Sequence, residues 1–412
     1  MTLIGRTMIQ CEVCAADVSG PILDLGFHPL CDDLVPIGSS RAVVAYHQEL
    51  QLCIGCLTVH QLHPVEKGVL FKSDYHYRAS LTDDVKRGMW ELVQQTIPRI
   101  RAPRRPVILD IGCNDGTLLA AFKKSLDCIT VGVDPTDAIL EHEGGIDYAY
   151  QDFFSFEVAQ RIVDKLGRPD VVTFTNVFAH IEDLGSLLEA LKVTLSPTTI
   201  VVIENHYLGS ILEGGQFDTF YHEHPRTYSA KSFAAIANRL GMEVDSLEFP
   251  SRYGGNIRVT LAPRTGAPSV VGSAMTWPSE DKVVDQFVAL QSQYEAWKFD
   301  ALETIDLLVK DRPLFGKALP GRAVMLISSL GLDVGTMPVI FEKPSSPKVG
   351  FYVPGTKIEV RSDDDFHQYG PDRLMLWSWH IAGEVANYMG DRGYTGELWK
   401  PMPKMMLWRH LA

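Results

Sequence analysis

The sequence has no hydrophobic run long enough to cross a membrane. A spanning helix needs about 18 or more consecutive apolar residues, and no such run occurs in the 412 residues. The N-terminal segment MTLIGRTMIQCEVC also lacks the apolar core of a secretory signal. We therefore expect a soluble, cytoplasmic protein with no membrane partner.

Positive charge is also scarce. Lysine and arginine number 38 against 51 aspartates and glutamates, so the net charge is −13 with histidine neutral. The longest basic cluster is RIRAPRR, whereas binding to nucleic acid needs a segregated basic face. A few local arginines or lysines can still hold a phosphorylated ligand. We expect a small-molecule substrate and no nucleic-acid partner.

The marks of several other protein classes are missing. The glycine-rich turn DIGCNDG lacks the GxGxxG spacing that seats a dinucleotide pyrophosphate. Neither a short repeat nor a low-complexity segment is evident. Seven cysteines in a chain of this length do not make a disulfide scaffold. The length itself predicts about two to three domains.

Four of the seven cysteines form two CxxC pairs, Cys11 with Cys14 and Cys53 with Cys56. Two such pairs can aim four thiolates at one ion, which predicts a closed, structural zinc site. A thioredoxin-like redox motif and unconnected core cysteines are the alternatives. Cys31 is either a fifth soft ligand or, as we favour, a small buried residue.

A nucleotide-type ligand site is predicted in the stretch RRPVILDIGCNDGTLLAAF. It reads as a strand from Val107 to Ile111, a glycine-rich turn and a helix beginning near Thr117. Glycines in the turn permit positive φ and let a ligand approach the end of the strand. The next strand, CITVGVD, ends in Asp134, whose carboxylate suits a ribose diol. The segment YQDFF then supplies Asp152 as a partner for an adenine amino group.

These elements favour S-adenosylmethionine over a dinucleotide, although one glycine-rich turn can also be a simple connection. A further strand and helix, DVVTFTNVFAHIEDLGSLLEALKVTL, bring Asn176 and His180 to the same edge. The alternation of strands and helices predicts a doubly wound α/β sheet with its ligand at the strand tips. The predicted cofactor-binding residues are Gly112, Asn114, Gly116, Asp134, Asp152, Phe153 and Asn176.

Several motifs, taken in order, resemble one known family. They are the two CxxC pairs, LFKSDYHYRAS, LDIGCNDGTLL, TNVFAHIEDL, ENHYLGSIL, FDTFYHEHPRTYS and RYGGNIRV. Together they resemble the zinc-containing, S-adenosylmethionine-dependent C-methyltransferases that act at C-3 of nucleotide-linked 4-keto-deoxysugars in antibiotic pathways. The resemblance runs nearly end to end. It implies a zinc-binding module in residues 1–75, a Rossmann-like methyltransferase domain in 76–262, and a Rossmann-like substrate-binding domain in 263–412.

The resemblance also implies how the segment FDTFYHEHPRTYS would work. Methylating a carbon beside a ketone needs a base and a donor to the enolate oxygen. Imidazole chemistry and the family pattern assign the base to His224. Glu223 would orient an imidazole or bind a hydroxyl, Tyr221 would donate to the enolate oxygen, and His180 would assist. The alternatives are a solvated loop, a metal site made by His222 and His224, and a purely structural His180.

Substrate contacts are implied from all three parts of the chain. Tyr75 matches a family tyrosine that closes the pocket, with Tyr77 as its rival. Gly254 and Gly255 either let a backbone pass close to a ligand or form a β-bulge. The predicted substrate-binding residues are Tyr75, Asn256, Arg258, Arg322 and Lys348.

The C-terminal part departs from the family pattern. FGKALPGRAVMLI has Arg322 at the family's lysine position and Val324 at its asparagine position, and WSWHIAGEV has His380 where asparagine is common. Arginine binds phosphate as a planar fork whose donors lie elsewhere than those of an ammonium. A different carrier, methylation of a non-sugar carbon, oxygen or nitrogen, and a non-enzymatic scaffold therefore stay open. We expect a monomer or weak oligomer.

Overall fold

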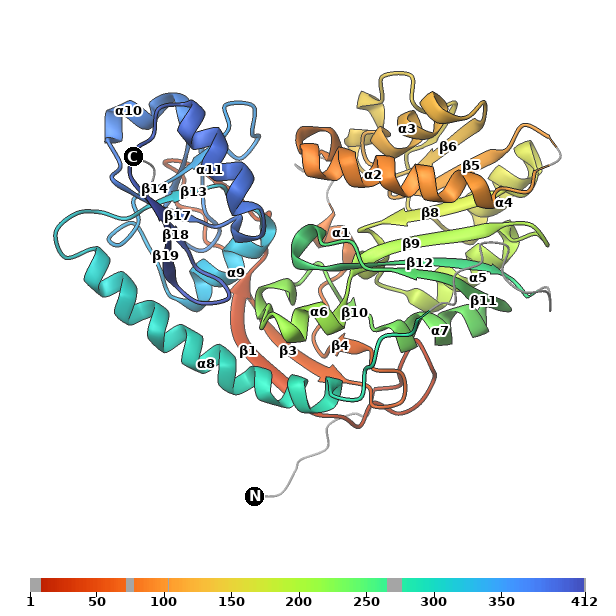
Figure 1. The fold of residues 1–412 in the computed structure, drawn as a ribbon, viewed down its shortest axis with the longest axis horizontal. Helices are drawn as coiled ribbons and strands as arrows, with labels where there is room; N and C mark the ends of the chain where they lie inside the picture. The colour runs from red at the N-terminus through yellow and green to blue at the C-terminus, as the bar shows by residue number, and fades with distance from the viewer. Residues whose placement is uncertain (1–8, 72–77, 103, 265–275, 411–412) are drawn as a thin grey trace.

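The computed structural model of the chain describes residues 9–71, 78–102, 104–264 and 276–410. Its strands form sheets of four, seven and eight strands, and helices pack around them (Figure 1). The predicted fold class, a Rossmann-like α/β arrangement preceded by a small cysteine-rich module, is confirmed. Within these ranges, none of the helices combines the length and apolar character that a membrane crossing needs.

The seven-stranded central sheet has the order β11-β12-β9-β8-β5-β6-β7. Its strands are β5 (Val107–Ile111), β6 (Ile129–Val133), β7 (Tyr148–Tyr150), β8 (Val171–Thr175), β9 (Ile200–His206), β11 (Met242–Glu248) and β12 (Asn256–Pro263). Strands β5 to β9 are parallel, and β12 runs antiparallel to both of its neighbours. The strand order reverses between β5 and β8, which opens a crevice at their carboxyl ends.

The central sheet forms as the sequence predicted because its parallel strands are mainly apolar and buried. All five residues of β5 are buried, as expected for a strand covered on both faces. The surrounding helices are α2 (Asp83–Thr96), α3 (Thr117–Ser125), α4 (Phe156–Leu166), α5 (Leu184–Thr194), α6 (Leu208–Glu213) and α7 (Ala230–Arg239). Helix α3 begins at Thr117 as predicted, directly after the glycine-rich turn.

The eight-stranded sheet has the order β19-β18-β17-β13-β14-β16-β15-β2. Its strands are β2 (Val35–Pro36), β13 (Phe315–Lys317), β14 (Val339–Glu342), β15 (Phe351–Tyr352), β16 (Glu359–Ser362), β17 (Arg373–Leu376), β18 (Glu397–Lys400) and β19 (Met406–His410). Its helices are α9 (Gly321–Ser329), α10 (Phe366–Tyr369) and α11 (Ala382–Asp391).

The four-stranded sheet has the order β1-β3-β4-β10. It contains β1 (Ile22–Pro29), β3 (Ala45–Leu52), β4 (Val59–Gln61) and β10 (Arg226–Thr227), with the short helix α1 (Lys67–Leu70) following β4. Strand β10 comes from the central part of the chain, and β2 from the N-terminal part joins the C-terminal sheet. The three parts therefore exchange strands, and the domain boundaries given above stay a prediction.

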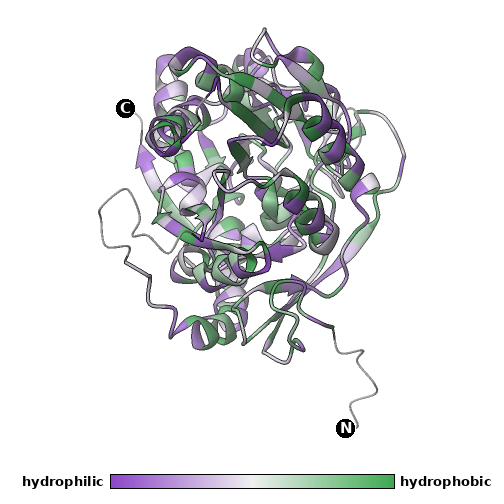
Figure 2. Ribbon diagram, turned by 90° about the vertical axis from the view of Figure 1, so that its right-hand side faces the viewer, coloured by the Kyte–Doolittle hydropathy of each residue, from purple (hydrophilic) through white to green (hydrophobic). Residues whose placement is uncertain are grey.

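One apolar core joins the N-terminal sheet to the C-terminal part. It contains Leu23 and Leu25 of β1, Phe287 of helix α8 (Val283–Leu308) and Leu326 of α9. Figure 1 shows α8 running along the base of the molecule beside β1, and Tyr294 Oη of α8 donates to Leu25 O at 3.3 Å. In Figure 2 the inner strands are mainly green and the peripheral helices carry purple stretches. The N-terminal sheet is thus a wedge between the two larger parts.

Strand β12 lies in a stretch rich in Pro, Gly and Ser and still belongs to the central sheet, where it inserts between β9 and β11. The apolar alternation of NIRVTLAP outweighs the flanking glycines and prolines, because six of its eight residues are buried.

Candidate functional site

The glycine-rich turn lies at the switch point of the central sheet. Gly112 has φ +71°, and a Cβ there would come within 2.4 Å of Val177 Cγ2. Gly116 has φ +75° and is the N-cap of α3. A larger side chain at position 112 would be strained by the positive φ and would also clash with Val177. Both effects favour glycine there. The turn thereby packs closely against Val177.

Carboxylate and amide groups surround this turn. Asp134 follows β6 and is buried, and its Oδ2 accepts from Asn114 N at 2.9 Å. Asn176 follows β8, and its Oδ1 accepts from Asn256 Nδ2 at 3.1 Å. Asp152 lies beyond β7 with an exposed side chain, and its Oδ1 accepts from Phe153 N at 2.8 Å. The predicted cofactor residues thus follow the carboxyl ends of four adjacent strands.

A cluster of histidines lies beside the YHEHP turn. The ring centroid of His224 is 4.8 Å from that of His180 and 5.2 Å from that of His206. The Tyr221 ring lies 4.2 Å from His224. His180 ends the 3₁₀ turn Phe178–His180 after β8, and His206 ends β9. Three separate segments therefore bring their rings together at the carboxyl edge of the sheet.

His224 is held in one tautomer. Its Nδ1 lies 2.9 Å from Thr219 O, and a carbonyl can only accept, so Nδ1 carries the proton. Burial, together with the nearby His180 and His206, lowers the pKa of His224 well below its ordinary value. The ring is therefore neutral, with its lone pair on Nε2. Among the described residues, the hydrogen bond found for this ring is the one at Nδ1.

Glu223 is positioned by a thiol. Cys31 Sγ donates to Glu223 Oε1 at 2.6 Å, and Glu223 Oε2 lies 3.9 Å from His180 Nδ1. Burial raises the pKa of Cys31, and burial also raises that of Tyr221, so both remain protonated donors. The expectation of a small buried residue at Cys31 is confirmed. Its bond to the carboxylate is a feature that the sequence did not indicate.

Two alternatives for this segment are wrong. His222, Glu223 and His224 are 3%, 4% and 3% exposed, so the segment is no solvated loop. His222 Nε2 lies 3.2 Å from Tyr46 O and His224 Nδ1 lies 2.9 Å from Thr219 O, and neither ring belongs to a group of three or more metal-ligating side chains among the described residues.

Buried neutral histidines make the stability depend on pH. Burial lowers the pKa of His180 to about 4 and that of His222 to about 4. The unfolded chain takes up those protons near pH 6.5, so these groups contribute their full stability above about pH 6.5. We expect the free energy of unfolding to fall between about pH 6.5 and pH 4, by up to about 1.4 kcal/mol per pH unit for each histidine. Denaturant titrations across this range should show the slope.

A His222→Asn variant provides the control for this pH dependence. It removes one of the titrating rings. Its unfolding free energy should therefore change less steeply between the same pH limits. A slope equal to that of the wild type would contradict the inference that His222 is buried and uncharged in the folded protein.

The C-terminal part reaches the histidines through Arg322. Its Nη2 lies 2.7 Å from Asp218 Oδ1 and its Nε 3.1 Å from Asp218 Oδ2. Its Nη1 donates to Tyr253 O at 2.7 Å, and the guanidinium lies 4.9 Å from the Trp379 ring. Trp379 Nε1 also donates to Asp218 at 2.9 Å. The guanidinium fork therefore ties the two large parts of the molecule together.

The other predicted substrate residues are also engaged with protein groups. Arg258 Nε donates to Glu204 Oε2 at 2.8 Å, and Asn256 Nδ2 donates to Glu204 Oε1 at 3.0 Å. Lys348 Nζ lies 3.0 Å from Asp32 Oδ1. Tyr75 and its rival Tyr77 lie outside the described residues.

The two glycines ahead of Asn256 pack closely against other side chains and form no β-bulge. A Cβ on Gly254 would lie 2.2 Å from Gln216 Oε1, and one on Gly255 would lie 2.5 Å from Ser210 Cβ. Strand β12 pairs with β9 in unbroken register from Asn256 onwards. The alternative of a β-bulge at this place is wrong.

Several buried polar atoms around the histidine cluster have no hydrogen-bond partner in the described part of the chain. They are His180 Nδ1, His206 Nε2, Asn256 Oδ1 and His380 Nδ1. The Tyr253 ring connects two of these side chains, at 5.6 Å from His206 and 6.0 Å from His380. A buried polar group without a partner costs about 1–3 kcal/mol, so their concentration marks a place for a polar ligand.

The four predicted zinc ligands converge. Sγ of Cys11 lies 3.6 Å from that of Cys56, and Sγ of Cys14 lies 3.7 Å from that of Cys53. All four sulfurs lie within 4.8 Å of one another. Tetrahedral zinc with bonds of about 2.3 Å separates its sulfurs by about 3.8 Å. The close pairs join different CxxC motifs, as a four-thiolate site requires and a redox pair does not.

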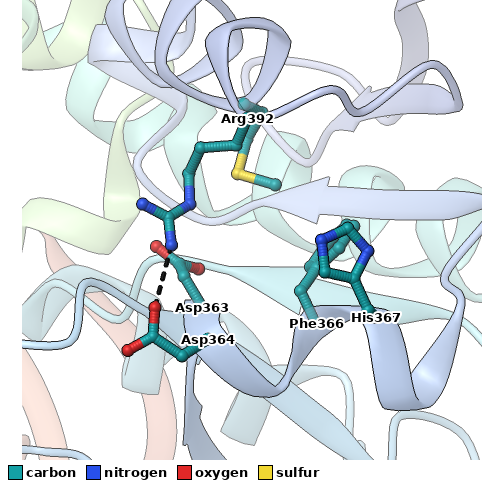
Figure 3. Close-up of a pocket in the computed structure, with 6 residues that line it drawn as sticks. Asp363, Asp364, Phe366, His367 and Arg392 are labelled. Atoms are coloured by element: carbon teal, nitrogen blue, oxygen red, sulfur yellow. Dashed lines mark hydrogen bonds and ion pairs between the residues drawn. The ribbon is translucent and has the colours of Figure 1, made fainter.

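A small pocket lies in the C-terminal part, and Figure 3 shows its lining. Arg392 Nη2 donates to Asp364 Oδ1 at 3.0 Å. Asp363 accepts from Lys317 Nζ and from Tyr388 Oη, each at 2.8 Å. The carboxylates and the guanidinium that line the pocket are thus already paired, and none of the predicted site residues lines it.

Comparison with known proteins agrees with this geometry. Residues 82–247 match the model of a methyltransferase domain, and residues 251–403 match that of a C-methyltransferase C-terminal domain. The C-methyltransferase NovU from Streptomyces niveus is 25% identical over 396 residues, which is 93% of each chain.

Solved structures of methyltransferases are similar over up to half of the chain. Magnesium protoporphyrin IX methyltransferase from Synechocystis is 13% identical, with a TM-score of 0.33 over 43% of this chain and 82% of its own. A methyltransferase from Archaeoglobus fulgidus is 17% identical, with a TM-score of 0.32 over 50% of this chain and 86% of its own.

Proposed function

The chain belongs to the S-adenosylmethionine-dependent C-methyltransferases, and we propose that it methylates a carbon beside the ketone of a nucleotide-linked 4-keto-deoxysugar. One observation carries the proposal. His224 donates through Nδ1 to Thr219 O, which leaves a basic Nε2 next to the rings of His180 and His206. A neutral imidazole with a fixed lone pair is what proton abstraction from carbon requires.

The cofactor fits the glycine-rich turn. When bound, S-adenosylmethionine supplies an electrophilic methyl group on a sulfonium. We assign the backbone between Gly112 and Gly116 to its amino-acid end, and the buried Asp134 carboxylate to the ribose hydroxyls. Asp152 and Phe153, beyond the next strand, are assigned to the adenine. Asn114 and Asn176 complete the proposed set.

The acid–base steps fall to the YHEHP turn. His224 Nε2 takes the proton from the carbon next to the ketone, and the electrons of that C–H bond pass to the ketone oxygen as an enolate. Tyr221 is a neutral phenol because burial raises its pKa, so it donates a hydrogen bond to the enolate oxygen. Held at the glycine-rich turn, S-adenosylmethionine would supply the methyl group that this nucleophilic carbon takes up, and its sulfur would keep the electron pair of the methyl–sulfur bond. Solvent finally removes the proton from His224.

Glu223 and His180 complete the proposed catalytic set. Glu223 is held by the Cys31 thiol at 2.6 Å and faces His180 at 3.9 Å. We assign Glu223 to a substrate hydroxyl, because its Oε2 points toward the ring of His180, which lies beside the proposed base His224. His180 contacts the substrate from the side of β8.

A sugar is supported by the unpartnered buried atoms. His206 Nε2, His380 Nδ1 and Asn256 Oδ1 are three polar atoms that a ligand rich in hydroxyl groups would satisfy. The carrier group is less constrained. Because Asp218 already occupies the Arg322 fork, an acceptor with a different carrier, or none, is the second candidate.

Incubation with S-adenosylmethionine and candidate acceptors tests the reaction. Mass spectrometry should find a product heavier than the acceptor by one methylene. With a 4-keto-deoxysugar nucleotide in D2O, one substrate hydrogen should exchange before or during turnover. Methylation on oxygen without such exchange would overturn the proposed mechanism.

We infer that the four cysteines hold a structural zinc ion. Replacing Cys53 with serine should lower the zinc content by one ion per chain and lower the thermal unfolding midpoint. The loss follows because the free energy of zinc binding contributes directly to folding in closed sites. Zinc analysis and thermal melts check this, with Cys128→Ser as the control for a cysteine outside the cluster. Equal zinc content in both variants would contradict the inference.

A further inference from the structure

A second group of metal-ligating side chains lies on the outer face of the N-terminal sheet, apart from the cysteines. Asp24 of β1 pairs directly with Glu49 of β3. His47 is two residues before Glu49, so both side chains share one face of the strand. His63 follows β4 by two residues. Four ionisable groups from neighbouring strands therefore meet on one surface.

The distances within this group suit an ion. His47 Nε2 lies 2.9 Å from Asp24 Oδ1, and His63 Nε2 lies 3.2 Å from Glu49 Oε2. One ligand atom from each of His47, Glu49 and His63 lies within 4.8 Å of the other two. Around an ion with bonds of about 2.1 Å, tetrahedral ligand atoms are about 3.4 Å apart. Closing onto an ion therefore takes a movement of about 1 Å.

The side chains differ in how much room they have to rotate, and this determines which of them moves to bind an ion. Glu49 is 10% exposed, and the His47 ring stacks on Phe27 at 4.6 Å with an interplanar angle of 9°. His63 is 53% exposed, and its ring lies 5.1 Å from that of His47 at an angle of 16°. Two nearly parallel rings cannot both point their lone pairs at one ion, so His63 must rotate. Its exposure gives it the room.

Charge provides an independent reason for a cation here. Carboxylates directly opposite each other on adjacent strands repel and destabilise a sheet, and Asp24 faces Glu49 in this way. Two imidazoles and a carboxylate are also a ligand set that zinc and related first-row divalent ions prefer. The chemistry of the group thus matches a transition-metal ion better than calcium or magnesium, which favour oxygen ligands.

We propose that His47, Glu49 and His63 bind a second divalent transition-metal ion, with water completing its coordination and Asp24 adding negative charge beside it. The site is distinct from the four-cysteine cluster and takes no part in the methyl-transfer chemistry. Nothing in the proposal depends on the identity of the acceptor.

The ion would brace the strands that hold the catalytic turn. Gln61 ends β4, and its Nε2 donates to Tyr221 O and to His224 O, each at 2.9 Å. Tyr46, next to His47, meets His222 through its carbonyl at 3.2 Å. Linking β3 to the segment after β4 therefore stiffens the support of the YHEHP turn from outside. Ion binding should raise the thermal unfolding midpoint of the whole chain.

The test measures how many zinc ions the full chain binds, by competition with a zinc-binding indicator. Wild-type protein should bind one more ion than His63→Ala, and His47→Ala should lose the same ion. His410→Ala, an exposed histidine on β19, should match the wild type. Circular dichroism establishes that each variant is folded, and Glu49→Gln gives a third variant that keeps the side-chain size.

Cobalt distinguishes the two sites. The ion in the four-cysteine cluster gives thiolate charge-transfer absorption, which His47→Ala should leave unchanged, while the second, sulfur-free ion disappears. Equal stoichiometry in the wild type and in His63→Ala would mean an adventitious ion only and would overturn the proposal. Loss of the second ion in Cys53→Ser, but not in His63→Ala, would overturn it as well.

Discussion

Replacing His224 with asparagine should abolish methyl transfer while leaving S-adenosylmethionine bound. The asparagine amide can still donate to Thr219 O, as Nδ1 of the imidazole does at 2.9 Å, so the turn keeps its support. What disappears is the basic Nε2. General-base catalysis contributes about 10²–10⁴-fold, and we expect kcat to fall by that factor.

Two measurements separate loss of the base from loss of the fold. Exchange of the substrate hydrogen in D2O should stop in the variant, because exchange needs the same proton transfer as methylation. Calorimetry should give an unchanged affinity for S-adenosylmethionine, since His224 lies outside the proposed cofactor set. Continued exchange at the wild-type rate would remove His224 from the role of base.

His222→Asn is the matched control. His222 and His224 lie two residues apart and are equally buried. His222 bonds Tyr46 O on the N-terminal sheet, away from the cluster formed by His180 and His206. Its replacement should leave most of the activity. A loss as large as that of His224→Asn would mean that the packing of the turn, and not one imidazole, sets the rate.

The pH–rate profile carries a related signature. The pKa of His224 lies well below its ordinary value because the ring is buried. The base should therefore stay neutral, and kcat should hold, as the pH falls from about 7 to about 6, where a solvent-exposed histidine would already be partly protonated.

The central sheet was predictable from sequence because local rules and tertiary packing agree there. The run VILDI has five apolar or buried positions followed by glycines that only a tight turn needs. Strand, turn and helix are each specified within about ten residues, so no distant contact is required to find them. The predicted strand Val107–Ile111 and the start of α3 at Thr117 coincide with the structure.

Only part of the histidine cluster could be predicted from the sequence. The rule that residues after parallel strands share one edge drew attention to Asn176 and His180. Applied to TIVVIENH, the same rule does not single out His206, because that residue is the last of the strand and does not follow it. Cys31 carried no such signal. Its bond to Glu223 joins residues 192 positions apart and depends on how the N-terminal sheet docks.

The resemblance to the family does not determine the role of Arg322. A basic residue in a turn after a strand suggests a phosphate ligand, and that assignment stays a prediction. The structure adds a competing role, since Arg322 and Asp218 are 5% and 0% exposed and lie 2.7 Å apart. No local pattern indicates such a pair, because its partners are 104 residues apart and lie in the 3₁₀ turn Phe217–Thr219 and in helix α9.

The second large effect should come from this pair. Arg322→Met and Asp218→Asn should each destabilise the protein by about 3–5 kcal/mol, because removing one member of a buried ion pair leaves the other charge uncompensated. Asp218→Asn also weakens the bond from Trp379 Nε1, which is 2.9 Å long. The double variant should cost clearly less than the sum of the single ones, since neither charge is then left alone. Denaturant unfolding of the four proteins measures the coupling.

The same four proteins decide between the two roles of Arg322. If the guanidinium holds the interface, both single variants lose stability together, and any rise in KM follows the unfolding. If it binds a substrate phosphate instead, Arg322→Met raises KM without loss of stability, and Asp218→Asn alone has little effect on either quantity. Additive stabilities in the double variant would rule out the interface role. The carrier group of the substrate would then have to be sought at Arg322, because its fork would be free to receive a phosphate.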